Sequence, residues 1–116
     1  MDKATLEKYL EGFKAAERSF PFGPEALVFK VMGKMFALTS LEERNLSLKC
    51  DPEKAIVLRE QYPSVTPARY MSKKHWNTVQ LDGSIPDTLI REWIVDSYGL
   101  VVEGLTRKQR DELAKA

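Results

Sequence analysis

The chain has 116 residues, of which 43% are hydrophobic and 30% are charged, a composition that predicts one folded domain over residues 1–116 and excludes a disordered chain. Its 18 lysines and arginines nearly balance 17 acidic residues, so the net charge of +1 excludes a strongly basic protein, and any affinity for nucleic acid must come from local segregation of charge. One cysteine and one histidine exclude an intramolecular disulfide bond and a Cys/His zinc site, which favours a reducing, cytoplasmic setting.

The N-terminal segment predicts an amphipathic helix over about residues 2–19. Leu6, Leu10 and Phe13 recur at helical spacing, and charged residues fill the other faces. Two prolines and a glycine within residues 20–24 then end the helix. Because the first residues are charged and no later run approaches ~20 apolar residues, we expect neither export nor insertion into a membrane.

Three strands are predicted next. Residues 26–32 and 35–39 alternate in polarity on either side of Gly33-Lys34, and a glycine at this point favours a tight hairpin turn. Residues 45–50 alternate in the same way and direct Cys50 toward the core, as expected for a sheet with one solvated face.

A second helix and a second hairpin follow. Asp51-Pro52-Glu53 supplies an N-cap acceptor, a proline at the first helical position and an acid at the positive end of the helix dipole. This predicts a helix that runs to about Tyr62. Residues 68–72 and 75–81 are then predicted to pair as a hairpin that Lys73 and Lys74 close.

Two helices complete the chain. Residues 84–87 have the spacing of a capping box. In the helix that follows, one face consists of five apolar residues and one serine: Leu89, Ile90, Trp93, Ile94, Ser97 and Val101. We expect this helix to cross the core, with Trp93 as an anchor. Gly104 ends it, and a capping box of Thr106 and Gln109 begins a short charged helix over residues 107–115.

The predicted order is therefore α-β(3)-α-β(2)-α-α in one α+β domain. Since hairpins cannot produce an all-parallel sheet, we expect a mainly antiparallel five-stranded sheet with helices packed on one face. This arrangement is a two-layer α/β sandwich, and the other face of its sheet is partly open.

Charge is distributed unevenly in this chain. Acidic residues are missing from residues 61–81 and from residues 26–41, and both stretches contain a predicted hairpin with lysine at its turn. Two basic wings of this kind could straddle phosphates, while Trp76 or Tyr70 offers an aromatic surface. The candidate nucleic-acid-binding residues are Lys30, Lys34, Arg69, Lys73, Lys74, His75 and Trp76. The alternative interpretation is that lysines at hairpin tips keep sheet edges soluble and discourage edge-to-edge pairing.

No group of residues predicts a catalytic site. His75 is the only histidine, and no nucleophile or orienting group lies near it in the sequence. The inward position of Cys50 predicts an unreactive core thiol and not a nucleophile activated by His75. The glycines are isolated and form no phosphate-binding loop. We therefore expect a protein that is not an enzyme, with no catalytic residue, no cofactor and no metal ion.

Several segments, in this order and spacing, resemble the MmcQ/YjbR family over essentially the whole chain: residues 20–31, 33–37, 48–52, 74–79 and 97–101. The resemblance implies a two-layer α/β fold similar to that of secretion chaperones, with the order α-β(3)-α-β(2)-α. It also implies DNA binding through a double wing of two hairpins. In this chain, Lys30 and Lys34 would form the contacts of the first wing. The contacts of the second wing would come from Arg69, Lys73, Lys74, His75 and Trp76.

Our leading hypothesis is a cytoplasmic DNA-binding protein with modest, salt-sensitive affinity and little sequence readout. It requires the lysines of the two hairpins to share a surface. A second hypothesis is a protein-interaction or chaperone-like module that receives a peptide or another copy on the open sheet face, or on the helix with Ile90 and Trp93. A third is a small-ligand or resistance protein, which requires a pocket that joins His75, Trp76 and Tyr98.

Overall fold

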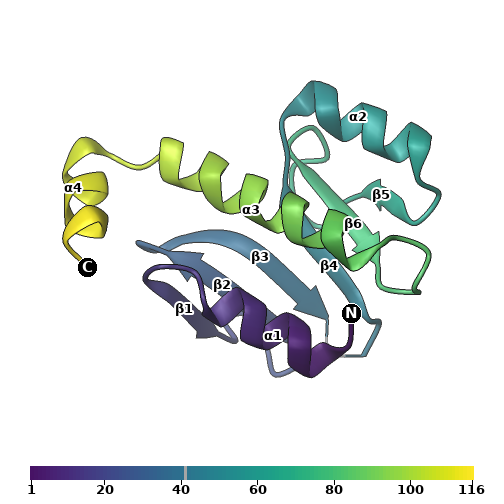
Figure 1. The fold of residues 1–116 in the computed structure, drawn as a ribbon, viewed down its shortest axis with the longest axis horizontal. Coiled ribbons are helices and arrows are strands. Elements are labelled where there is room, and N and C mark those ends of the chain that lie inside the picture. Colours follow the sequence, from purple (N-terminus) through teal and green to yellow (C-terminus); the bar gives the residue numbers. More distant parts are fainter. Residues whose placement is uncertain (41) are drawn as a thin grey trace.

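The structure is a computed structural model that describes residues 1–40 and 42–116 (Figure 1). Leu41, the last residue of one acid-free stretch, lies outside the described residues. The elements in chain order are α1 (Lys3–Glu11), β1 (Ala16–Ser19), β2 (Ala26–Val31), β3 (Lys34–Ser40), β4 (Asn45–Lys49), α2 (Pro52–Gln61), β5 (Val65–Pro67), β6 (Trp76–Gln80), α3 (Asp87–Glu103) and α4 (Arg107–Lys115). In the described part of the chain, six strands form one antiparallel sheet in the order β1-β2-β3-β4-β6-β5. The predicted α+β class is confirmed.

The sheet has one strand more than predicted, because the first helix is shorter. α1 ends at Glu11, and Ala15 adopts a φ of +59° before residues 16–19 pair with β2 as β1. The prediction of a helix to Ser19 was wrong, and the order is α-β(4)-α-β(2)-α-α instead of α-β(3)-α-β(2)-α-α. Charged residues suit an exposed helix and an edge strand equally well. Pairing with β2 decides between the two, because it gives this segment's backbone its hydrogen-bond partners.

Both hairpins differ in detail from the prediction. The tight turn between β2 and β3 lies at Met32-Gly33, one residue earlier than expected, and both residues have positive φ (+49° and +80°). The second hairpin has no tight turn at Lys73-Lys74, since β5 pairs with β6 at residues 65–67 and a long loop over residues 68–75 connects them. Pro67 fits this position because an edge strand needs no amide donor on its outer side.

Most predicted helix ends are confirmed. The Asp51 carboxylate accepts a hydrogen bond from the Glu53 amide, Gly104 is the C-cap of α3, and Thr106 and Gln109 form a reciprocal capping box. The capping box expected at residues 84–87 is not formed. Ser84 instead donates its amide and hydroxyl to Asp82, which lowers the pKa of that carboxyl group, and Pro86 begins α3 without a side-chain cap.

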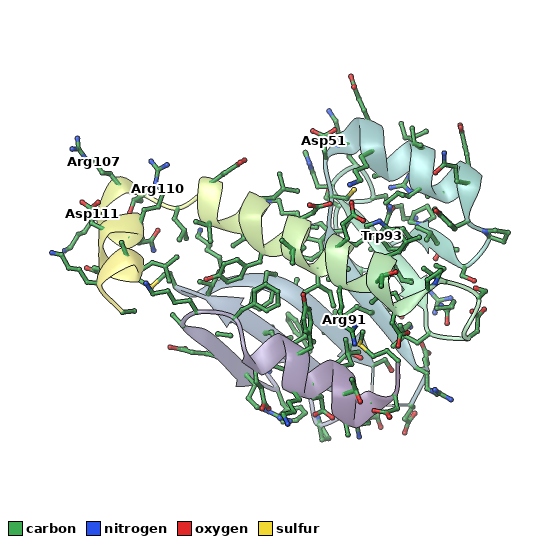
Figure 2. All side chains as sticks on the ribbon, viewed as in Figure 1. Asp51, Arg91, Trp93, Arg107, Arg110 and Asp111 are labelled. Carbon is green, nitrogen blue, oxygen red and sulfur yellow. The ribbon has the colours of Figure 1, made fainter. Side chains whose placement is uncertain are left out.

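The helices and the sheet enclose one hydrophobic core. α1 and α3 lie across one face of the sheet, and α2 packs beside β5 and β6 (Figure 1). Leu27, Phe29 and Val31 of β2 point into this core. Trp93 (Figure 2) is 6% exposed and packs edge-to-face against Tyr62 with ring centroids 5.4 Å apart. In the part of the chain that is described, no helix is both long and apolar enough to cross a membrane.

A β-bulge at Phe36 shapes the contact between α3 and the sheet. Phe29 pairs with Ala37 and Lys30 pairs with Met35, so Phe36 is the extra residue. Phe36 and Ala37 are both fully buried, and the Phe36 ring contacts the rings of Phe13 and Tyr98 on the helix side. The bulge thus places two consecutive side chains in the core.

The hydroxyl of Ser97 connects α3 to both strands beside this bulge. At this end of the sheet, the outermost pair between β3 and β4 is Ala37 with Leu48. Phe36 and Lys49, the next residues outward, are therefore not paired with each other. Ser97 Oγ donates to the Phe36 carbonyl at 2.6 Å and accepts from the Lys49 amide at 2.9 Å. The side chain is fully buried. A hydroxyl of the helix therefore joins backbone groups of two neighbouring strands.

We predict that Ser97→Ala destabilises the protein by about 2 kcal/mol, because the substitution leaves a buried carbonyl and a buried amide without their partner. Urea unfolding followed by circular dichroism measures this change. Ser72→Ala is the matched control, since Ser72 is exposed and should change the free energy of unfolding by less than about 0.5 kcal/mol. Equal stability of the two variants would contradict the bridging role of Ser97.

Candidate nucleic-acid interface

The strand register brings the two predicted basic wings to the same end of the sheet. Val31 pairs with Lys34 at the tip of the first hairpin, and Lys49 pairs with Trp76 where β4 ends and β6 begins. Because neighbouring strands are antiparallel, the β2–β3 tip and the loop of residues 68–75 both leave the sheet here. We call this the Lys49 end. The opposite Asn45 end is where Asn45 pairs with Gln80.

Cations gather at the Lys49 end. Lys34, Lys73 and Lys74 are exposed, as is Arg69, whereas Lys30 and Lys49 are half-buried. Within residues 1–40 and 42–116, none of these side chains forms an ion pair. The acidic neighbours at this end are Glu17, which pairs with Lys30 in the sheet, Asp51 and Glu53 at the start of α2, and Asp96 of α3, which lies near Lys49 and forms an ion pair with Lys54 at 2.8 Å.

Acidic residues gather at the Asn45 end instead. Glu25, Glu42, Glu43 and Asp82 precede or follow the strands there, together with one cation, Arg44. The sheet is therefore polarised along its strands, although the whole chain has a net charge of +1. A charge count over the whole chain hides this segregation.

The lysines of the two wings share an end of the sheet, but Lys30 lies on a different face from Lys73 and Lys74, so the single shared surface that the DNA hypothesis requires is not formed. Lys30 lies on the open face of β2, since Phe29 and Val31 on either side of it point into the core. Lys73 and Lys74 line a depression of about 270 Å³ against α2, beside Glu53, Ile56 and Arg59. The β2–β3 tip and the loop of residues 68–75 lie apart in Figure 1. Only a ligand that extends around this end would meet both groups.

Arg59 holds the second wing in place. Its Nε donates to Asn77 Oδ1 at 2.7 Å, and its Nη2 donates to the backbone carbonyl of Lys73. The buried Asn77 in turn donates to the Ala55 carbonyl at 3.2 Å. Cys50 donates its amide to the His75 carbonyl at 2.7 Å, so the end of the loop is also tied to the residue after β4. The position of Lys73 is therefore set by α2.

Two residues that matter at this end, Lys49 and Arg59, could not be recognised from the sequence. In the sequence, Lys49 is a single charged residue in a strand whose polarity alternates. Its position between the two wings becomes clear only from its pairing with Trp76. Arg59 resembles any other charged helix residue, and its partners lie 14 and 18 positions away. α4 carries further cations, but Arg107 and Arg110 are interspersed with Asp111 on one short helix (Figure 2).

The residues considered for a small-ligand site are not brought together. Trp76 points to the open face, because its neighbour Asn77 contacts α2 on the other side. Tyr98 packs against Phe13 on the helix side and donates its hydroxyl to the Lys14 carbonyl at 2.7 Å. Burial raises the pKa of the Tyr98 phenol. Neither the open-face groove nor the two smaller depressions beside α2 are lined by His75, Trp76 or Tyr98.

Cys50 is half-buried, and this burial raises the pKa of its thiol, which disfavours the reactive thiolate. Among the described residues, no side-chain hydrogen bond joins Cys50 to His75, and no cluster of His, Cys, Asp and Glu has the arrangement of a metal site. Ile90 and Trp93, proposed as a docking face, are only 2% and 6% exposed and belong to the core.

Comparisons with known proteins agree with this fold over most of the chain. A family model described as YjbR matches residues 11–100. The uncharacterized protein YbdF of Escherichia coli O157:H7 is 43% identical over an alignment that covers 95% of each chain. The uncharacterized protein YjbR of Escherichia coli strain K12 is 36% identical over an alignment that covers 99% of each chain.

Solved structures share the arrangement of helices and strands. A Deinococcus radiodurans protein superimposes with a TM-score of 0.88 and 40% sequence identity, covering 96% of this chain and 86% of its own. A Pseudomonas syringae protein superimposes with a TM-score of 0.74 and 28% identity, covering 86% of this chain and 98% of its own. The resemblance seen in the sequence motifs is confirmed, and the chain belongs to the YjbR family.

Proposed function

We propose that this protein binds DNA by its phosphate backbone through the cations of the Lys49 end. The observation that carries the proposal is the uneven distribution of charge along the sheet, with unpaired lysines outnumbering the acidic residues at the Lys49 end and carboxylates outnumbering Arg44 at the Asn45 end. Lysine and arginine side chains that neutralise phosphates release condensed counterions, and this release drives sequence-independent binding. Exposed cations without an acidic partner are the groups best suited to this role.

The two wings would contact separate phosphates. Lys34 leaves the sheet at the β2–β3 tip, whereas Lys73 and Lys74 lie along α2, so a duplex or a strand has to pass around the Lys49 end to reach both groups. Arg59 favours such contacts because it fixes the loop that carries Lys73, and an ordered loop loses less conformational freedom on binding.

We expect little sequence readout from these contacts. Lysine is a point charge without the planar fork that lets arginine read a guanine edge. Arg69, the arginine of the second wing, lies with its guanidinium 5.9 Å from the ring centroid of Tyr70.

Cys50 adds no support for catalysis, since its thiol is half-buried and has a raised pKa. We therefore propose a binding protein and not an enzyme.

The test is fluorescence anisotropy of labelled duplex and single-stranded DNA, measured at ~50 and ~200 mM salt. If about four phosphates are contacted, the affinity should fall about a hundredfold across this interval. Lys73→Glu/Lys74→Glu should weaken binding at low salt and reduce the slope of log affinity against log salt by about two, because each phosphate contact contributes about one.

The matched control is Lys3→Glu/Lys8→Glu, which changes the net charge equally at exposed positions of α1. It should retain most of the affinity, since α1 contacts β1 at one edge of the sheet, whereas α2 contacts β5 and β6 at the other edge. Equal loss in both double variants would show that total charge, and not the Lys49 end, governs binding. Absence of binding by the unmodified protein at ~50 mM salt would overturn the DNA proposal.

A further inference from the structure

The open face of the sheet carries a groove that the Lys49 end does not account for. The groove has a volume of about 460 Å³, which is within the size range of sites for small ligands. Its floor crosses β3, β4, β6 and β5 and combines the apolar residues Ala26, Leu38, Pro67 and Met71 with uncharged polar side chains: Ser40, Asn45, Ser47, Thr66, Thr78 and Gln80. In register, Ser47 pairs with Thr78 and Asn45 pairs with Gln80.

Aromatic side chains line this groove from two loops that are far apart in the sequence. Phe22 belongs to the segment between β1 and β2 and is 71% exposed, and Tyr70 belongs to the loop of residues 68–75 and is 86% exposed. Burial in the core cannot explain the position of either ring. Exposed aromatic faces beside a polar floor suit a flat ligand that stacks on a ring and forms hydrogen bonds at its edge.

The floor has hydrogen-bonding capacity to spare. The hydroxyls of Ser47 and Thr78 bond to each other at 2.8 Å, and Asn45 Nδ2 donates to a Glu43 carboxylate oxygen at 3.0 Å. In the described part of the chain, the Gln80 amide, the Thr66 hydroxyl and Asn45 Oδ1 have no hydrogen-bond partner. An amide group offers a donor and an acceptor side by side, and the edge of a nucleobase presents the same pair.

Acidic and basic residues lie at opposite ends of the groove. Glu25 and Glu43 line it near the Asn45 end, while Arg69 lines it from the second wing. Lys30 and Lys49 face the same side of the sheet closer to the Lys49 end. Phosphates are therefore attracted toward the Lys49 end and repelled from the Asn45 end. Carboxylates at the Asn45 end are also acceptors for an exocyclic amino group.

We propose that this groove receives one unpaired nucleobase of a single strand whose phosphates lead toward the Lys49 end. The base stacks on Tyr70 or Phe22, and its edge bonds to the amides of Asn45 and Gln80. The proposal rests on the proposed DNA binding for its phosphate contacts, and it adds a preference for unpaired over paired strands. An extended peptide is a poorer match, because the groove crosses the face of strands that are already paired with one another and not a free strand edge to which a peptide strand could be added.

Anisotropy with a single strand and a duplex of the same sequence tests this proposal. Tyr70→Ala should weaken single-strand binding about tenfold and leave duplex binding unchanged, because stacking on an aromatic ring requires an unpaired base. Tyr70→Phe should restore the affinity, since it keeps the ring. Val57→Ala is the control, as Val57 is exposed on α2 and does not line the groove.

The outcomes separate this inference from the proposed function. If Lys73→Glu/Lys74→Glu weakens binding but single strand and duplex bind equally and Tyr70→Ala has no effect, the groove proposal is overturned and DNA binding stands. If neither form of DNA binds, both proposals are overturned.

Nuclear magnetic resonance gives an independent readout, because cytidine should shift the amide signals of Ser47, Thr78 and Gln80. If these signals instead change with protein concentration alone, a second copy fills the groove and the proposal is overturned.

A preference among bases provides a further test. Cytosine presents an amino donor where thymine presents a carbonyl acceptor, so the carboxylate of Glu25 favours cytosine. We expect oligo(dC) to bind about fivefold more tightly than oligo(dT) of equal length. Glu25→Gln should reduce this difference, whereas Glu42→Gln, an exposed neighbour outside the groove lining, should preserve it. Equal binding of both strands would exclude recognition of the base edge in the groove.

Discussion

The hydroxyl of Ser97 is the interaction on which this architecture depends most. The bulge at Phe36 leaves a β3 carbonyl and a β4 amide without direct strand partners, and Ser97 bonds to both from α3. A buried backbone group without a partner is costly, so α3 is held at one position over the sheet. The apolar face of the same helix, with Ile90, Trp93 and Ile94, then packs only on this side. The opposite face carries polar side chains that are mostly half-buried, among them Asn45, Thr78 and Gln80.

The bulge also explains why the two basic wings share an end but not a face. A β-bulge increases the local right-handed twist of a strand, and twist accumulates from one strand to the next. The β2–β3 hairpin carries the bulge, while the loop of residues 68–75 is fixed to α2 by Arg59. The two segments consequently diverge as they leave the sheet (Figure 1). Lys49 and Trp76 lie between them on the open face.

Features with a local physical cause could be predicted from the sequence. Asp51-Pro52, Gly104 and the pair Thr106–Gln109 mark helix ends through caps of adjacent residues, and the apolar face of α3 follows from its spacing. Features that depend on tertiary pairing could not. β1 was mistaken for helix because its charged residues suit both states, and the role of Ser97 depends on a bulge 61 residues earlier in the chain. The acid-free stretches were visible, but their gathering at one end depends on strand register.

The polarised sheet explains how a chain with almost no net charge can still favour an anionic ligand. A strand rises about 3.3 Å per residue, so the ends of β3 (Lys34–Ser40) are roughly 20 Å apart. The Debye length at physiological salt is about 8 Å. Carboxylates at the Asn45 end are therefore screened from a phosphate at the Lys49 end, and the local potential there depends on its own charges, among which the cations outnumber Glu17, Asp51, Glu53 and Asp96. In the proposed complex, the same separation would orient a strand across the open face, because its phosphates avoid one end of the groove while an uncharged base does not.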